Sequence, residues 1–93
     1  MNLEQLRAEI DDIDERLIKL LAERFVVTRQ VGHLKAAQGM PAIDSTREAQ
    51  IETKARRLAE ENDLDSGLVT EVLRSVIDRV VAEHQTIAAT GAE

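Results

Sequence analysis

The first third of the chain carries its apolar residues on alternating steps of three and four positions. These residues are Leu3, Leu6, Ile10, Ile13, Leu17, Leu20, Val27, Val31 and Leu34. Such spacing is the apolar seam of a heptad repeat and predicts one helix from about residue 3 to residue 37. Asn2 can cap its start, and Gly39 followed by Pro41 ends it. At ~1.5 Å per residue this helix is about 50 Å long, more than one such chain can cover by itself.

Two shorter helices are predicted to follow. The second begins near Ser45, is highly charged, has a narrow apolar stripe and fades at residues 61–63. The third begins after Asp65, a good N-cap residue, and reaches Ile87. Its apolar positions include Val69, Val72, Leu73, Val76, Ile77 and Val80. We therefore expect an all-α fold with one long, one short and one medium helix, in a single domain over residues 1–90, followed by a frayed tail at residues 91–93.

The composition narrows the class of protein. The chain of 93 residues has no cysteine, and Phe25 is its only aromatic residue of the Phe, Trp and Tyr group. Because disulfides are excluded, oligomerisation is the common remaining route to stability for so short a chain. A net charge of −6 argues against a nucleic-acid partner. No stretch approaches the ~20 apolar residues of a membrane span, and the acidic start is not a signal peptide. We expect a soluble, cytoplasmic protein.

Cations interrupt the apolar seam of the long helix. Arg24 occupies a seam position, and Lys35 lies three turns later on nearly the same face. An unpaired guanidinium in an apolar seam is costly, so Arg24 must meet an anion, either a ligand or an acidic side chain such as Glu23 or Asp14 of a partner helix. Arg7 lies about 25 Å further along the axis.

The position of Arg7 gives a second reason to expect a dimer. If two long helices pair antiparallel about a two-fold axis near residue 18, Arg7 of one chain comes level with Arg24 and Lys35 of the other. The predicted assembly is an intertwined homodimer with two shared cationic pockets for a small dianion.

The start of the second helix carries another polar cluster. Ser45-x-x-Glu48 has the form of a capping box, with Ser45 as N-cap and Glu48 reaching back from the third helical position. That interpretation leaves Arg47 unexplained. A helix N-terminus that faces a cationic pocket also favours an anionic ligand.

The chain resembles the small all-helical chorismate mutases, typified by the mutase domain of bacterial bifunctional prephenate enzymes. The resemblance covers nearly the whole chain without insertions. Its blocks are Leu6-Arg7-x-x-Ile10-Asp11-x-Ile13-Asp14, Leu20-Leu21-Ala22-Glu23-Arg24, Val31-Gly32-x-x-Lys35, Pro41, Asp44-x-x-Arg47-Glu48 and Ala59-Glu60-Glu61-Asn62-x-Leu64-Asp65. Each block alone is a weak signal, whereas the ordered set is specific.

This resemblance implies an enzyme of aromatic amino acid biosynthesis that rearranges chorismate, a dicarboxylate, to prephenate in one pericyclic step without a cofactor. Arg24, Arg47 and the partner subunit's Arg7 match the family arginines that clamp the two carboxylates. Lys35 matches the lysine that stabilises the negative charge growing on the ether oxygen.

Two further positions complete the implied site at the start of the second helix. Glu48 matches the residue that accepts a hydrogen bond from the ring hydroxyl, and Asp44 lines the same loop.

Two family positions on the third helix depart from the common pattern. Val80 stands where the family commonly has a serine. His84 stands where it commonly has a glutamine, the second donor to the ether oxygen. His84 points inward, either as that donor or as a buried histidine satisfied by a backbone carbonyl. Gln85 is the next candidate donor, although it lies about 100° around the helix. His33 is expected at the surface, and neither histidine has the spacing of a metal site.

These departures leave alternatives open. The same fold serves isochorismate-pyruvate lyases, and mutases acting on 4-amino-4-deoxychorismate are also possible. The carboxylate of Glu48 favours a mutase over a lyase, and it suits an ammonium at least as well as a hydroxyl. A non-catalytic helical dimerisation module, with cations that only set the register, is the alternative from another class.

Overall fold

The computed structural model describes residues 1–90 as three helices, α1 (Leu3–Ala37), α2 (Ser45–Glu61) and α3 (Ser66–Ala89). The all-α fold with one long, one short and one medium helix is confirmed. The tail predicted at residues 91–93 lies outside the described residues. No helix within residues 1–90 combines the length and the apolar content needed to cross a membrane.

Local capping contacts explain where the helices begin and end. The Asn2 side chain accepts a hydrogen bond from the Gln5 amide, and the Gln5 side chain accepts one from the Asn2 amide, each at 2.9 Å. Gly39 has a φ of 67°, a left-handed conformation that ends α1. Asp65 accepts from the amide of Leu68 at 3.2 Å, so it is the N-cap of α3 as predicted.

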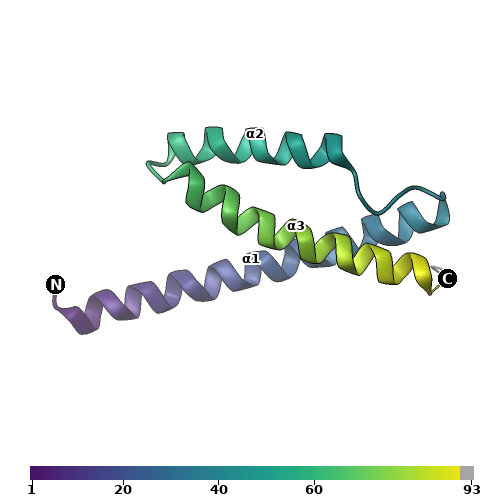
Figure 1. Cartoon of the computed structure of the whole chain (residues 1–93). Coiled ribbons are helices and arrows are strands. Elements are labelled where there is room, and N and C mark those ends of the chain that lie inside the picture. The colour runs from purple at the N-terminus through teal and green to yellow at the C-terminus, as the bar shows by residue number, and fades with distance from the viewer. Residues whose placement is uncertain (91–93) are drawn as a thin grey trace.

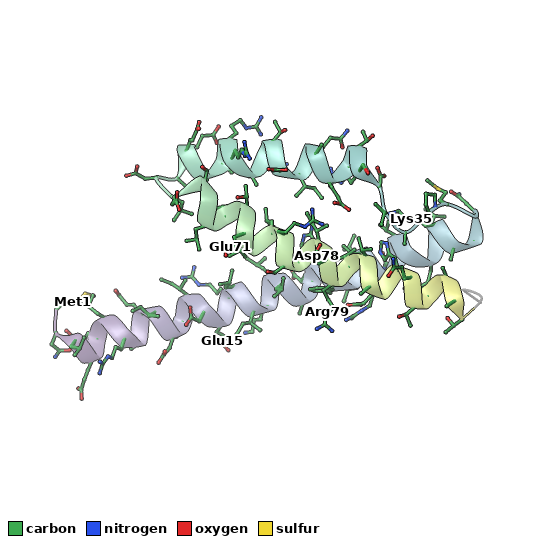
Figure 2. The ribbon with its side chains drawn as sticks, viewed as in Figure 1. Met1, Glu15, Lys35, Glu71, Asp78 and Arg79 are labelled. Atoms are coloured by element: carbon green, nitrogen blue, oxygen red, sulfur yellow. The ribbon has the colours of Figure 1, made fainter. Side chains whose placement is uncertain are left out.

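The central element is α3, which crosses the C-terminal half of α1 on one side and packs along α2 on the other (Figure 1). The N-terminal half of α1, marked by Met1 and Glu15 in Figure 2, projects away from α2 and α3. The molecule measures 54 × 25 × 14 Å, and α1 accounts for its long dimension. Within residues 1–90, it is therefore the second half of α1 that packs against the other helices.

The core of this chain is small. Its buried apolar side chains within residues 1–90 are Ala55 and Ala59 of α2 and Ile77 of α3. The small alanines allow α2 and α3 to approach closely. The chain exposes 7242 Å², whereas a folded monomer of 10.3 kDa typically exposes about 5,400 Å². Its radius of gyration is 16.5 Å, against about 12 Å for a compact domain of this length. Much apolar surface thus remains in contact with water.

Candidate active site

A cavity of about 270 Å³ lies where the C-terminal half of α1 meets α3 and the start of α2. Seven of the eight side chains predicted for the site line it: Arg24, Lys35, Asp44, Arg47, Glu48, Val80 and His84. The rest of its wall is mostly apolar and consists of Val27, Thr28, Val31, Ala42, Ile51, Ile77 and Val81. The eighth residue, Arg7, lies in the projecting half of α1 and is not part of this cavity.

Arg24 brings a buried positive charge to the cavity wall. Its Nη1 atom is inaccessible to water and has no hydrogen-bond partner among residues 1–90. Neither Glu23 nor Asp14 of the same chain forms an ion pair with it. A buried guanidinium nitrogen without a partner is energetically costly, so the site favours an anion that can accept its hydrogen bond.

Lys35 lies on the same stripe of α1, near the connection to α2 (Figure 2). Its Nζ donates a hydrogen bond to the carbonyl oxygen of Ala42 at 3.3 Å, which ties the connecting segment to α1. An ammonium carries three N–H groups. Lys35 therefore keeps donors for a ligand while one of them holds the loop.

Asp44, not Ser45, is the N-cap of α2. Its Oδ1 atom accepts a hydrogen bond from the Arg47 amide at 3.0 Å, and its backbone is extended. The capping box predicted for Ser45 and Glu48 is therefore wrong, because the N-cap lies one position earlier and Asp is as good a cap as Ser. Glu48 moves to the fourth helical position, where its side chain is free to turn toward α3.

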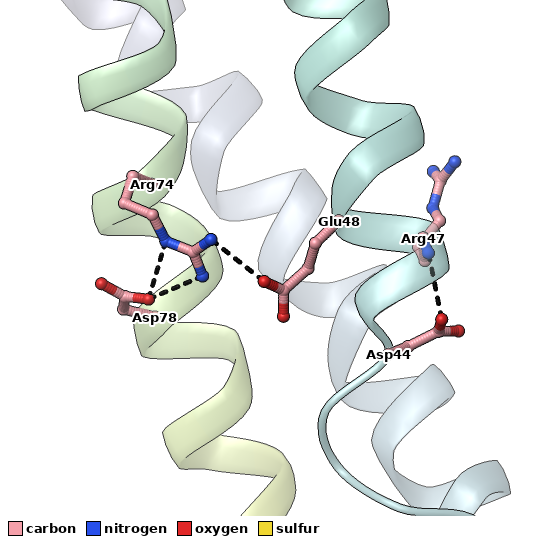
Figure 3. A network of polar contacts seen from close by, with 5 residues as sticks. All are labelled: Asp44, Arg47, Glu48, Arg74 and Asp78. Carbon is pink, nitrogen blue, oxygen red and sulfur yellow. Dashed lines mark hydrogen bonds and ion pairs between the residues drawn. The ribbon is translucent and has the colours of Figure 1, made fainter.

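Glu48 forms an ion pair across the helix interface (Figure 3). Its Oε1 atom accepts from Nη1 of Arg74 at 3.0 Å. Arg74 also donates to Oδ1 of Asp78, through Nη2 at 2.7 Å and through Nε at 2.9 Å. Hydrogen bonds to Asp78 and then to Glu48 raise the pKa of Arg74 above its ordinary value, so its guanidinium stays charged. In the same view the guanidinium of Arg47 points away from Glu48.

His84 is buried, with 4% of its surface exposed. Its Nε2 atom lies 2.7 Å from the carbonyl oxygen of Thr28. A carbonyl can only accept, so Nε2 carries the proton in the neutral ring. The Nδ1 atom is buried without a partner among the described residues. Neutral His84 thus presents a lone pair at Nδ1, and only the imidazolium can donate there.

Gly32 fixes the ring of His84 in this orientation. A Cβ atom at Gly32 would lie 2.6 Å from Cδ2 of His84 and 2.9 Å from Cδ1 of Ile87. The ring edge that carries Cδ2 and Nε2 therefore contacts the α1 backbone, and the edge with Nδ1 faces away from it. A glycine inside a helix costs ~1 kcal/mol, and this close approach is what requires it.

The other predicted histidine and the alternative donor lie elsewhere. His33 is exposed, as expected. Gln85 is also exposed and does not line the cavity, so it is not a substitute for His84. Within the part of the chain that is described, no three His, Cys, Asp or Glu side chains gather as they would around a metal ion.

Sequence reasoning missed Arg74, Asp78 and the Thr28 carbonyl. The Arg74–Asp78 pair has the spacing of a helical ion pair and was detectable as such. Its contact with Glu48 depends on how α2 packs against α3, which no local pattern reveals. The sequence analysis foresaw a backbone carbonyl as a possible partner of His84. It could not show that this carbonyl belongs to Thr28.

Comparisons with known proteins identify the family of this chain. A family model described as chorismate mutase type II matches residues 6–85. The chorismate mutase of Methanocaldococcus jannaschii is 32% identical over 76 residues, which cover 82% of this chain and 77% of that protein.

Two larger relatives contain a similar segment. The T-protein of Haemophilus influenzae is 41% identical over 73 residues, 77% of this chain and 19% of that protein. The bifunctional chorismate mutase/prephenate dehydratase of Escherichia coli is 30% identical over 82 residues, 88% of this chain and 21% of that protein. This chain spans about a fifth of these two relatives. Since the family match covers most of the chain, this protein belongs to the chorismate mutase type II family.

Proposed function

We propose that the cavity binds chorismate through its two carboxylates and rearranges it to prephenate. As a member of its family the protein is a chorismate mutase, an isomerase. The observation that carries the proposed mechanism is Nη1 of Arg24, a buried donor that lacks an acceptor and lines a cavity of the size of a small molecule. In the reaction a C–O bond breaks as a C–C bond forms within one molecule, so neither a proton transfer nor a covalent intermediate is required.

Arginines supply the binding energy in this proposal. Arg24 binds one carboxylate through its unpartnered face, and Arg47 binds the other after its exposed side chain turns toward the cavity. Bidentate guanidinium–carboxylate pairs fix orientation as well as position. Holding the enolpyruvyl group over the ring in the reactive geometry removes much of the entropic barrier.

Two donors stabilise the transition state. Negative charge develops on the ether oxygen because the C–O bond lengthens before the C–C bond has formed. Lys35 donates to this oxygen through an N–H that the Ala42 carbonyl does not occupy. His84 donates through Nδ1 when the ring is charged, since its other nitrogen is occupied by the Thr28 carbonyl. Donors aimed at developing charge are typically worth ~3–4 kcal/mol each.

The complete site is proposed to need a second copy of the chain. Leu17 is 62% exposed, and the other seam residues of the projecting half of α1 are exposed as well. An antiparallel pairing of two α1 helices would cover these residues and bring Arg7 of the partner subunit level with Arg24 and Lys35. The third guanidinium then reaches the cavity from the other chain.

Mixing two inactive variants tests the shared site. Arg7→Ala and Arg24→Ala proteins should each be nearly inactive when loss of chorismate absorbance is followed. A heterodimer carries both lesions in one cavity and neither in the other. Unfolding and refolding the two together should therefore restore up to about a quarter of the parental activity. The control is a mixture of two separate Arg24→Ala preparations, which should recover no activity. If the Arg7→Ala and Arg24→Ala mixture also recovers no activity, shared sites are contradicted.

A further inference from the structure

Glu48 separates two hollows of the molecule. One is the candidate active-site cavity, and the other is a hollow of about 350 Å³ between α2 and α3. Glu48 lines both of them, whereas Arg74 lines only the second. Arg74 therefore contacts the carboxylate of Glu48 from the side opposite to the proposed substrate.

The contacts of Arg74 assign different tasks to the two oxygens of Glu48. Oε1 accepts from Arg74, and Oε2 has no hydrogen bond within residues 1–90. Asp78 binds Nε and Nη2 of Arg74, which fixes the plane of the guanidinium and leaves Nη1 for Glu48 (Figure 3). The Glu48 side chain is only 22% exposed, whereas that of Arg74 is 50% exposed, so water screens the pair from the Arg74 side. The carboxylate is held in place, and its positive partner lies outside the cavity.

We propose that Arg74 is a positioning and specificity-determining residue, which directs the free oxygen of Glu48 at the ring substituent of the substrate and selects a hydroxyl over an ammonium there. This inference rests on the proposed function, in which Glu48 accepts a hydrogen bond from that substituent. Neither the arginines that bind carboxylates nor Lys35 touches this part of the ligand in the proposal.

The selection follows from the charge of the pair. A hydroxyl is neutral and needs only a correctly directed acceptor, which Oε2 provides. An ammonium would gain from the charge of Glu48, but Arg74, which Glu48 shares with Asp78, offsets part of that gain. The ammonium would also meet a like charge on the far side of the carboxylate. Because the Arg74 side chain is 50% exposed and screened by water, this repulsion changes a binding constant about three- to tenfold. Arg74 thus shifts the preference of this cavity toward chorismate and away from its amino analogue.

The test compares kcat/KM for chorismate and for 4-amino-4-deoxychorismate in the parent and in Arg74→Gln. The parent should prefer chorismate. Removing the guanidinium should shift the ratio of the two values about three- to tenfold toward the amino compound, because the charge of Glu48 is no longer partly offset. Arg79→Gln is the matched control, since Arg79 is an exposed arginine of the same helix that lines neither hollow, and it should leave the ratio unchanged. If turnover of the amino compound is too slow to measure, its inhibition constant in the chorismate assay is compared between variants in place of its kcat/KM.

A second set of variants separates positioning from general damage. Arg74→Lys keeps the charge and should keep the ratio within about twofold of the parent. Arg74→Gln introduced into Glu48→Gln should cause no further shift, since the target of the guanidinium is gone. An unchanged ratio in active Arg74→Gln, or the same shift with Glu48 absent, would overturn the inference. Failure of the parent to convert either compound would contradict the proposed function instead.

Discussion

The two halves of α1 carry the same apolar repeat but have different surroundings. In the half before Arg24 every residue is exposed, and its ion pair is a local one between Lys19 and Glu15 at 3.3 Å. In the second half Gly32 is buried against α3, and Arg29 reaches Glu83 of that helix at 2.7 Å. One stretch of a single helix therefore forms the wall of a cavity, while the other has no neighbouring element among the described residues.

This difference shows that a heptad seam indicates which face will be covered but not by which element. The apolar residues at the start of α1 are as regularly spaced as those that follow Arg24. The seam residues that follow Arg24 also stay exposed, Val27 at 56%, Val31 at 40% and Leu34 at 57%. In the second half α3 covers other positions, such as Gly32, where it crosses α1 (Figure 1). Both sets of seam residues therefore leave apolar surface for another helix, and a second copy of α1 fits the same periodicity.

The largest expected effect comes from a charge in the uncovered seam. Leu17 lies next to the proposed two-fold axis, so Leu17→Glu would bring two carboxylates together in an apolar interface. Burying such charges costs several kcal/mol, which weakens association by ~1000-fold or more. Sedimentation equilibrium at micromolar concentration should show two chains for the parent and a loss of that species for Leu17→Glu, together with its activity.

The matched control for this substitution is Lys19→Ala, two residues away. The Lys19 side chain is 73% exposed and pairs only with Glu15, an interaction of small value at the surface. Its sedimentation and activity should remain those of the parent. A folded, active monomer, in either the parent or Leu17→Glu, would contradict the proposal that the first half of α1 is covered by a second copy.

A smaller effect is expected at His84, in the covered region. Because Nε2 is occupied by the Thr28 carbonyl, donation to the ether oxygen has to come from Nδ1, and kcat should fall when this ring is removed.

Two substitutions of His84 make this prediction specific. His84→Gln should retain substantial activity, since a neutral amide can donate to the same oxygen. His84→Ala should lose activity by ~10- to 1000-fold, as expected when a polar donor is removed. Parental activity in His84→Ala would mean that His84 only packs and holds the Thr28 carbonyl.

The smallest effect concerns the contact between Gly32 of α1 and His84 of α3. Gly32→Ala improves helix propensity by ~1 kcal/mol but places a Cβ atom 2.6 Å from the ring of His84. Overpacking of this kind costs ~1–3 kcal/mol, so urea denaturation at fixed chain concentration should show net destabilisation. Gly67→Ala is the control, because the atom nearest to its added Cβ, Oδ2 of Asp65, lies at 3.4 Å. This substitution should be neutral or stabilising. A stabilised Gly32→Ala would show that α1 and α3 can separate at no cost.

The positions of the helices were predictable because they depend on neighbours within about one turn. Such local predictions are confirmed for the long helix α1, for the caps Asn2 and Asp65 and for the break at Gly39. The start of α2 near Ser45 is confirmed, but its N-cap was placed one residue too late, since Asp44 and Ser45 are both good caps and local rules do not distinguish them.

The sequence by itself determined the three helices, their lengths and the stripe of cations on α1, since periodicity and capping are local properties of the chain. Only the tertiary structure decided that Glu48 binds Arg74, that Arg24 is left with an unpartnered Nη1 and that His84 carries its proton on Nε2. Each of these depends on how close two helices approach, and that distance is set by the packing of Ala55, Ala59, Ile77 and Gly32. The residue types along the chain therefore determine which chemical groups the site contains. The contacts between helices determine how those groups are oriented.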